Sequence, residues 1–166
     1  MTGTTLLWLL LAIDPFGDAA KKAVVLLFTR VDCPISNRYA PEVKRIYDRY
    51  NARGIAFYLV YPDKTMTAAE MEAHRREYGY PMPAVADPAH ELVAKAGARI
   101  TPEAAVFVGG KLVYRGRIDD RYVDFGQSRL APTRYDLDDV LAAVLAGKPA
   151  PFHETKAIGC AIDDLR

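Results

Sequence analysis

Continuous runs of apolar residues alternate along this chain with segments in which apolar positions recur every three or four residues. Residues 23–29 and 55–61 are almost entirely apolar, a pattern typical of strands buried on both faces of a parallel sheet. Residues 34–53 lie between them and carry apolar side chains at spacings of three and four, which predicts an amphipathic helix that ends before Gly54. The first part of the chain is therefore predicted to be a strand–helix–strand unit.

The rest of the chain continues this alternation. Residues 67–78 predict a helix, because Thr67 and Glu70 have the spacing of a capping box. Two later strands meet at Gly109-Gly110-Lys111, which predicts a tight antiparallel hairpin. The order predicts an α/β fold with a central mixed sheet and helices on both faces. The remaining predicted elements are a short strand at 83–86, a helix at 87–96, strands at 104–108 and 112–118, a polar loop at 119–133 long enough to be a partner-binding surface, and a helix at 135–146.

Composition narrows the class of protein. The chain of 166 residues is long enough for one domain with a real core, which we place at residues 21–147, with residues 148–166 as a tail. A formal net charge of +1 gives no reason to expect nucleic acid or an acidic membrane surface as partner. Two cysteines are too few for a disulfide scaffold and lack the spacing of a zinc site.

The first 20 residues need a separate interpretation. Residues 6–13 read LLWLLLAI, which is shorter than the ~20 residues of a membrane span but matches the apolar core of a secretory signal. Residues 1–20 are thus either a signal peptide, which predicts a periplasmic or otherwise exported protein, or an N-terminal extension of a cytoplasmic one.

Cys33 lies where the first predicted strand gives way to the first predicted helix. Sites form at the carboxyl ends of strands in open α/β sheets. A thiol there faces the free N–H groups of the helix start, which lower its pKa, and Pro34 suits the first helical position. Arg30 and Arg38 would add positive charge, whereas Asp32 would oppose it. This position favours a reactive thiol over the alternative, a buried structural cysteine.

A proline motif, Ile100-Thr101-Pro102, precedes a later predicted strand. Proline cannot donate to a strand ladder, so Pro102 is expected at a turn or a strand entry, where some X-Pro bonds are cis. Arg115 and Arg117 share one face of the last predicted strand and are expected to face solvent.

The three histidines, His74, His90 and His153, lack the spacing of metal ligands and are expected at the surface. No metal is therefore expected. A copper site made by Cys33, Cys160 and a histidine is the alternative, because thiolate and imidazole suit copper.

These motifs together resemble the thioredoxin-like superfamily, and within it the redoxin group of alkyl hydroperoxide reductases and thiol-specific antioxidant proteins. The stretch VVLLFTRVDCPIS resembles the redox site of that superfamily, and Pro41 matches a proline that follows its first active cysteine by eight residues. Thr101 and Pro102 match its cis-proline motif, and FVGGKLVYRGRID resembles its closing hairpin. The resemblance implies a thioredoxin-like three-layer sandwich over residues 21–147, with oxidoreductase or antioxidant activity.

The resemblance also implies roles for individual residues. Cys33 would attack a disulfide or a small peroxide, and Ser36, at the place of the second cysteine of C-x-x-C, would hydrogen-bond its thiolate. Cys160, the only other cysteine, would resolve the product by pairing with Cys33. Thr101 and Pro102 would shape the substrate groove and keep the Cys33 sulfur accessible. The implied partners are protein thiols or disulfides, small peroxides and a thiol reductant, without an organic cofactor.

One departure from the family pattern leaves the activity open. Typical peroxiredoxins have threonine three residues before the reactive cysteine and proline four residues before that, whereas this chain has Arg30 and Leu26. The alternatives are a peroxiredoxin-like peroxidase and a non-catalytic binding or copper-handling module in which Cys33–Cys160 is a structural disulfide.

Overall fold

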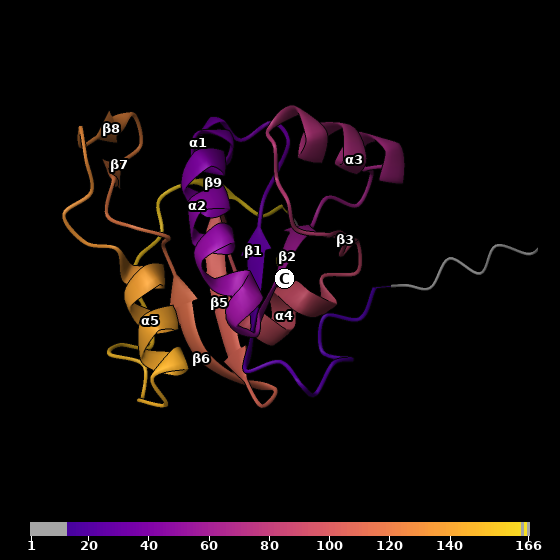
Figure 1. Ribbon diagram of the computed structural model, residues 1–166. Helices are drawn as coiled ribbons and strands as arrows, with labels where there is room; N and C mark the ends of the chain where they lie inside the picture. Colours follow the sequence, from indigo (N-terminus) through magenta and orange to yellow (C-terminus); the bar gives the residue numbers. More distant parts are fainter. Residues whose placement is uncertain (1–12, 164, 166) are drawn as a thin grey trace, which may run out of the picture.

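The computed structural model describes residues 13–163 and 165, which form an α/β domain around a five-stranded mixed sheet (Figure 1). The strands lie in the order β3-β2-β1-β5-β6. β1, β2 and β3 run parallel, whereas β5 is antiparallel to both β1 and β6. The predicted α/β class with a mixed central sheet is confirmed. The strands of this sheet are β1 (Ala23–Phe28), β2 (Ile55–Tyr61), β3 (Ala84–Ala86), β5 (Glu103–Val108) and β6 (Lys111–Gly116).

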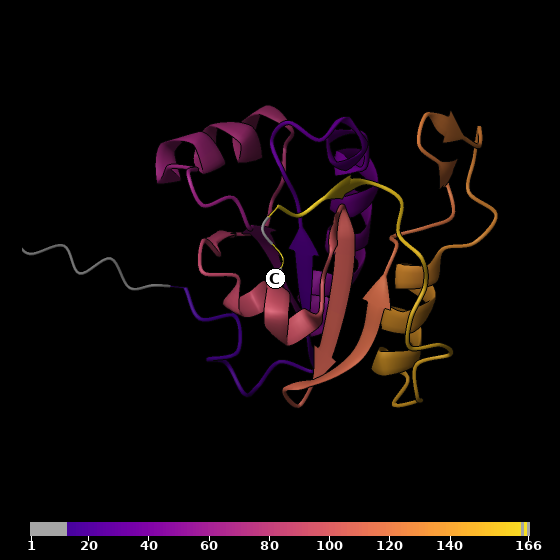
Figure 2. The ribbon, with the colours of Figure 1, turned by 180° about the vertical axis from the view of Figure 1, so that it is seen from behind.

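Two apolar cores lie on opposite faces of the sheet, because successive side chains of a strand point to opposite sides. Within β1, Val25 and Leu27 enter one core, and Val24 and Leu26 enter the other. Helices α2 and α5 cover the first face and α4 covers the second (Figures 1 and 2). The helices are α1 (Pro34–Arg38), α2 (Ala40–Tyr50), the 3-10 turn η1 (Asn51–Arg53), α3 (Ala68–Glu77), α4 (Glu91–Ala96) and α5 (Asp136–Leu145).

The prediction of a single helix over residues 34–53 is wrong, because the helix is interrupted at Tyr39. The first helix, α1, ends at Arg38, and Tyr39 then separates it from α2. Pro41 explains the interruption, since proline has no N–H to continue the helical hydrogen bonds and disfavours helical geometry just before it. The cysteine therefore heads a short helix of its own.

Two other predicted helices differ in how well the sequence places their starts. The helix at 67–78 and its capping box are confirmed. The helix predicted at 87–96 begins later, at Glu91. Asp87 still binds the first turn of this helix, because its carboxylate accepts the N–H of Val93 at 2.9 Å. The N-cap position itself is occupied by His90, so the start predicted at residue 87 is wrong.

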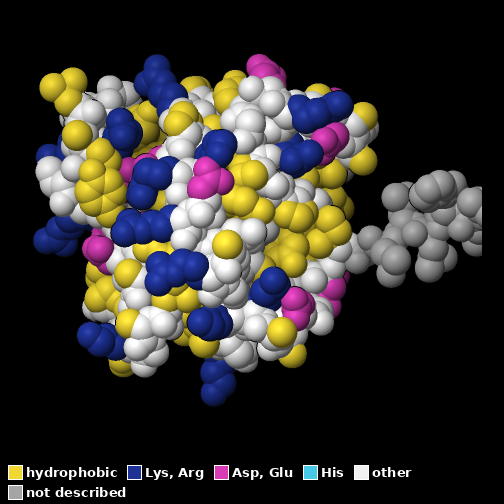
Figure 3. Space-filling model, viewed as in Figure 1, with side chains coloured by type: hydrophobic (Ala, Val, Ile, Leu, Met, Phe, Trp, Pro, Cys, Tyr) yellow, Lys and Arg dark blue, Asp and Glu magenta, His cyan; other side chains and the backbone are white. Residues whose placement is uncertain are grey.

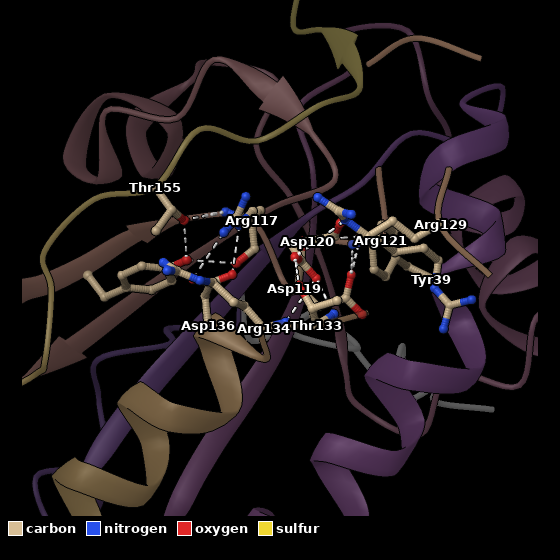
Figure 4. Close-up of polar contacts among 11 residues, drawn as sticks. Tyr39, Arg117, Asp119, Asp120, Arg121, Arg129, Thr133, Arg134, Asp136 and Thr155 are labelled. Carbon is tan, nitrogen blue, oxygen red and sulfur yellow. Dashed lines mark hydrogen bonds and ion pairs between the residues drawn. The ribbon is translucent and has the colours of Figure 1, made fainter. Parts of the chain in front are cut away.

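The long polar loop at 119–133 is held at its base by Asp120 (Figure 4). The Asp120 carboxylate accepts the N–H groups of Thr133 and Arg134 at 2.6 and 2.9 Å. Burial alone would raise the pKa of Asp120, but these hydrogen bonds and Arg129 outweigh it and lower the pKa to about 2. The loop also contains a short hairpin of β7 (Tyr122–Asp124) and β8 (Gln127–Ser128).

Arg115 of β6 and Arg117, which follows the end of this strand, do not form the solvated face that the sequence predicted. Arg117 pairs with Asp136 of α5 at 2.7 Å. Arg115 pairs with Glu154 of the tail and lies 3.7 Å from the carboxylate of Glu103, which is buried. The prediction was wrong because α5 and the tail lie against this edge strand.

The tail runs along β6 and then crosses the edge of the sheet at which β1 ends (Figure 2). Its backbone follows β6 because the N–H of Thr155 donates to the carbonyl of Arg115 at 3.1 Å. Further on it forms strand β9 (Cys160–Ala161), which pairs antiparallel with β4 (Ile100–Thr101). The tail thus belongs to the folded domain.

The apolar run at 6–13, on which the predicted signal peptide at 1–20 depends, lies outside the described residues apart from Ile13. Just after it, Phe16 packs edge-on against Phe107, with ring centroids 5.1 Å apart. In the described part of the chain, no helix has the length and apolar character needed to cross a membrane.

Candidate functional site

Cys33 is the residue from which α1 starts, shortly after β1 ends at Phe28. Its N–H donates to the carbonyl of Arg30 at 3.3 Å, and its own carbonyl accepts the N–H of Asn37 at 3.1 Å. Pro34 fills the first helical position, where a missing N–H costs no hydrogen bond. The thiol therefore stands at the predicted junction of strand and helix.

The motif around Pro102 meets this junction from another part of the chain. The Thr101–Pro102 peptide bond is cis. The Cys33 thiol donates a hydrogen bond to the carbonyl oxygen of Thr101 at 3.1 Å. Both residues have no measurable exposure to solvent. The backbone before Pro102 therefore forms one wall of the thiol's surroundings.

Strand β9 brings the second cysteine to the same place. Cys160 lies directly opposite Thr101 in the β4–β9 pair. The Thr101 hydroxyl donates to the carbonyl of Cys160 at 3.3 Å. The structure thus gathers every residue that the sequence singled out for the site: Cys33, Ser36, Thr101, Pro102 and Cys160.

The surroundings of Cys33 favour its thiolate. Burial alone would raise the pKa of Cys33. Hydrogen bonds from Cys160 and from the side chain and backbone of Ser36 outweigh burial, so the pKa of Cys33 lies below the ordinary value. Among the described residues the buried Ser36 hydroxyl has no hydrogen-bond partner in place, so it is free to turn its proton toward the sulfur.

Cys160 behaves in the opposite way. Burial, followed by its hydrogen bond to Cys33 and the negative charge there, raises the pKa of Cys160 to about 12. The two thiols therefore titrate as a coupled pair. The first proton leaves Cys33, and Cys160 keeps its proton and donates to the resulting anion.

The Cys33 sulfur is not accessible, contrary to the role expected of Thr101 and Pro102. Cys33 is 0% exposed, and Ser36 is buried beside it. Cys160 is only partly buried. The expectation was wrong because the tail strand lies against β4 and closes the space over the thiol.

Arg30 has a role that the sequence did not indicate. Its guanidinium donates to the carbonyl of Ala161 at 3.1 Å and to Asp163 at 2.9 Å, both in the tail. It also pairs with Asp32, at 3.1 Å. The sequence suggests Arg30 only as a source of positive charge, because no spacing connects it to residues so far along the chain.

Tyr80 was missed as well. Its hydroxyl donates to the carbonyl of Ser36 at 3.2 Å. Burial raises the pKa of Tyr80 well above its ordinary value. Tyr80 therefore holds α1 in place through the carbonyl of Ser36. The sequence gave no sign of this contact, because Tyr80 lies between two predicted elements.

His74, predicted at the surface, is buried beside the turn that carries the cysteine. Its Nδ1 lies 2.8 Å from the Tyr61 hydroxyl, and its Nε2 lies 2.9 Å from Asn37 Oδ1. Because an amide oxygen only accepts, Nε2 carries the proton and Nδ1 accepts. Asn37 in turn donates to the carbonyl of Val31 at 2.9 Å. This chain of hydrogen bonds ties the turn before Cys33 to α3.

The two thiols have no histidine beside them in the part of the chain that the structure describes. Over residues 13–163 and 165, no three His, Cys, Asp or Glu side chains are grouped so that they would hold a metal ion. The copper site considered from the sequence therefore lacks its third ligand there.

The mixed sheet, the cysteine at the end of β1 and the facing cis-proline backbone define a protein of the thioredoxin-like class. Residues 15–117 match the model of the AhpC/TSA family. The chain belongs to this family, which confirms the predicted redoxin group and the thioredoxin-like fold. A search of curated proteins finds no match.

Solved structures share the fold over most of the chain. An uncharacterized conserved protein from Geobacillus kaustophilus is 27% identical, with a TM-score of 0.75 over 86% of this chain and 77% of that one. A hypothetical protein from Sinorhizobium meliloti 1021 is 25% identical, with a TM-score of 0.73 over 86% and 80%. StoA from Bacillus subtilis, 16% identical with a TM-score of 0.51 over 60% and 75%, is similar in fold alone.

Proposed function

We propose that this protein is a thiol–disulfide oxidoreductase of the redoxin type, in which Cys33 is the attacking thiolate and Cys160 is the resolving thiol. One observation carries the proposal. Cys160 lies opposite Thr101, and the carbonyl of Thr101 accepts the hydrogen bond of the Cys33 thiol. Two sulfurs far apart in sequence are thereby brought to one place, where they can form a disulfide with little movement.

The reaction with a disulfide has two steps. The Cys33 thiolate attacks one sulfur of the substrate, forms a mixed disulfide, and releases the other substrate sulfur as a thiolate. Cys160, after giving up its proton, attacks Cys33, forms the Cys33–Cys160 disulfide, and releases the second substrate thiol. The substrate is reduced by two electrons, and an external thiol reductant then restores the pair.

A peroxidase is the second candidate, and membership of the AhpC/TSA family favours it. The Cys33 thiolate would attack a peroxide oxygen and release an alcohol or water, leaving a sulfenic acid. The Cys160 thiol would then form the same disulfide and release water. The residue three places before Cys33 argues against peroxide as the main substrate, since Arg30 is bound to the tail.

The β7–β8 hairpin offers a contact surface for protein substrates. Phe125 is 64% exposed, and Val123 and Leu130 are also exposed. Figure 3 shows apolar side chains at the corner of the molecule that holds this hairpin, with Lys and Arg side chains below them. Tyr122, at the start of β7, lines a small cavity together with Pro102. An exported location, favoured by the run at 6–13, would suit disulfide chemistry.

Turnover and thiol counting test the proposal. The reduced protein, freed of reductant, is incubated with a disulfide-bonded protein substrate or with hydrogen peroxide, and its free thiols are counted after each reaction. Turnover is measured in a parallel reaction that contains a dithiol reductant. We expect wild type to accumulate a Cys33–Cys160 disulfide. Cys160→Ser should stop at a mixed disulfide or sulfenic acid, and Cys33→Ser should be inactive.

The same experiment separates the candidates. Peroxide consumption without disulfide reduction would assign the peroxidase. The non-catalytic alternative replaces both the oxidoreductase and the peroxidase if neither substrate changes the two thiols. It also replaces them if the Cys33 thiol titrates with a pKa at or above the ordinary value of about 8.5.

A further inference from the structure

The backbone contacts of the tail are those of a peptide bound to the edge of a strand. β9 adds to β4 as an antiparallel strand, with Ile100 opposite Ala161 and Thr101 opposite Cys160. Beyond the pair, the N–H of Ile162 donates to the carbonyl of Arg99 at 2.9 Å. Main-chain hydrogen bonds of this kind recognise an extended peptide whatever its side chains.

Gly159 shows how closely the tail approaches β4. A Cβ atom built on Gly159 would overlap the backbone carbonyl of Thr101 and crowd the side chain of Ile100. A larger residue at this position would push the tail away from the strand. The fit of the cysteine opposite Thr101 therefore depends on a very small residue immediately before it.

The polar contacts that hold the tail are exposed and separable. Arg30 binds the carbonyl of Ala161 and the carboxylate of Asp163. The Asp163 side chain is 76% exposed, and an ion pair exposed in this way contributes little to stability. Two apolar side chains of the tail segment also contact the domain: Ile162 is buried, and Ile158 packs against the core. The tail is thus docked by contacts that a competing segment of similar form can replace.

The closed form hides the thiol that the proposed function requires. Cys33 is completely buried under these contacts. A disulfide within a folded protein cannot approach its sulfur while Cys160 occupies the position opposite Thr101. Access for a protein substrate requires the tail to leave β4.

We propose that the edge of β4 is a peptide-binding site, which the chain's own residues 158–163 occupy as an internal competitor. A protein substrate reaches Cys33 by replacing these residues with an extended segment of its own. In that segment a glycine or a similarly small residue precedes the disulfide-bonded cysteine. This inference rests on the proposed function and adds the form of its substrate. The substrate segment pairs with β4, and its cysteine takes the place of Cys160.

The exchange then proceeds in a balanced order. Cys33 attacks the sulfur of the bound cysteine, and the other half of the substrate disulfide leaves as a thiolate. The tail returns as the reduced segment departs, because Cys160 attacks Cys33 and releases the segment's thiol. One site is occupied in turn by the substrate and by the resolving cysteine.

Peptide probes test the inference directly. Every protein in the experiment carries Cys160→Ser, so Cys33 is its only cysteine. The probe is a synthetic peptide with the sequence of residues 157–163, whose cysteine is linked to thionitrobenzoate as a mixed disulfide. The matched probe has valine in place of the glycine. The release of thionitrobenzoate gives the rate for each probe, and oxidised glutathione serves as a small disulfide.

Two variants change how firmly the tail is held, and a third serves as their control. Asp163→Asn removes the tail's carboxylate from Arg30, and Gly159→Val disturbs the close approach to Thr101. Asp48→Asn is the matched control, because it removes the carboxylate of another exposed ion pair, with Lys44 of α2, that has no part in holding the tail. Circular dichroism and thermal unfolding show whether each variant folds.

We expect the glycine peptide to react about tenfold faster than the valine peptide, because the valine side chain would disrupt a backbone hydrogen bond to β4. Asp163→Asn should raise the reaction rate of the glycine peptide about two- to fivefold, the range for an exposed ion pair. Gly159→Val should raise this rate more. Asp48→Asn should leave the rate as it is. If Gly159→Val fails to fold, the comparison of the two peptides and the rate of Asp163→Asn still test the peptide site.

Two different failures are distinguishable. A Cys33 that reacts with oxidised glutathione, but at equal rates with the two peptides and with no effect of Asp163→Asn, overturns the peptide site alone. A Cys33 that reacts with neither glutathione disulfide nor peptide in any of these proteins overturns the proposed function, and the inference with it.

Discussion

The thiol of Cys33 donates its hydrogen bond to the carbonyl oxygen of Thr101 at 3.1 Å. This contact stabilises the neutral thiol, because a carbonyl oxygen cannot donate to a thiolate. When Cys33 loses its proton, the donors that remain are Cys160 and Ser36. The charge on the sulfur therefore depends on two side chains that the sequence itself indicates as site residues.

Replacing Ser36 by alanine should weaken the thiolate. The variant loses a hydroxyl that favours the charged form, so the pKa of Cys33 rises and its alkylation at neutral pH slows about tenfold or less. Alkylation rates measured across a range of pH give the midpoint. Ser128→Ala, at an exposed position of β8, should leave both values unchanged. Equal midpoints for Ser36→Ala and wild type would contradict this role.

Oxidation should stabilise the fold. A Cys33–Cys160 disulfide closes a loop that spans most of the chain, and loop-closure entropy sets an upper limit of about 5 kcal/mol on its contribution. Guanidinium unfolding of the oxidised protein should therefore have a higher midpoint than unfolding of the reduced protein. Cys160→Ser should unfold at the same midpoint with or without reductant. A wild-type midpoint that does not respond to reductant would contradict the pairing.

The Tyr39 hydroxyl donates to the buried carboxylate of Asp119 at 2.6 Å (Figure 4). Tyr39→Phe leaves this carboxylate without one of its donors and should lower the free energy of unfolding by about 1–3 kcal/mol. Chemical denaturation measures the loss, and Tyr135→Phe, an exposed position, is the control. A loss no larger than that of the control would rule out a stabilising role for the contact.

Asp119 should also make stability depend on pH. Burial raises the pKa of Asp119 despite the hydrogen bond from Tyr39, so the folded state holds the proton more tightly than the unfolded state. Between the ordinary aspartate pKa and this raised value, the free energy of unfolding should fall as the pH rises. Asp119→Asn should lack this slope, and unfolding measured at several mildly acidic pH values compares the two proteins.

His74 should add the opposite dependence. Burial lowers the pKa of His74, so the unfolded state binds a proton that the folded state resists. The free energy of unfolding should therefore decrease as the pH falls below about 6.5, the ordinary histidine value. His74→Gln should reduce this decrease, whereas His153→Gln, at an exposed position, should not. Identical slopes for both variants would show that His74 does not titrate in this way.

The main sheet and the position of the first cysteine could be predicted because their signals are local. β1 and β2 are continuously apolar since both of their faces are covered, and Gly109 and Gly110 have the positive φ values that a tight hairpin needs. The place of Cys33 follows from the change between two such patterns.

The closure of the site could not be predicted because it depends on contacts between distant backbones. β9 is only two residues long, and strand pairing through N–H and carbonyl groups has no side-chain signature. The partners of Arg30 in the tail and the burial of His74 likewise follow from where the chain returns in space. Gly159 was a visible clue, since a glycine next to a cysteine is consistent with a close backbone approach.

The second sulfur is carried on a strand near the end of the chain, so the redox state of the pair decides how that end is fastened. In the oxidised protein a covalent bond anchors residues 158–163, whereas in the reduced protein an ion pair, the buried Ile162 and a few backbone hydrogen bonds hold them. An antibody that recognises this segment, or a protease that cleaves it, should therefore react differently with the oxidised and the reduced protein.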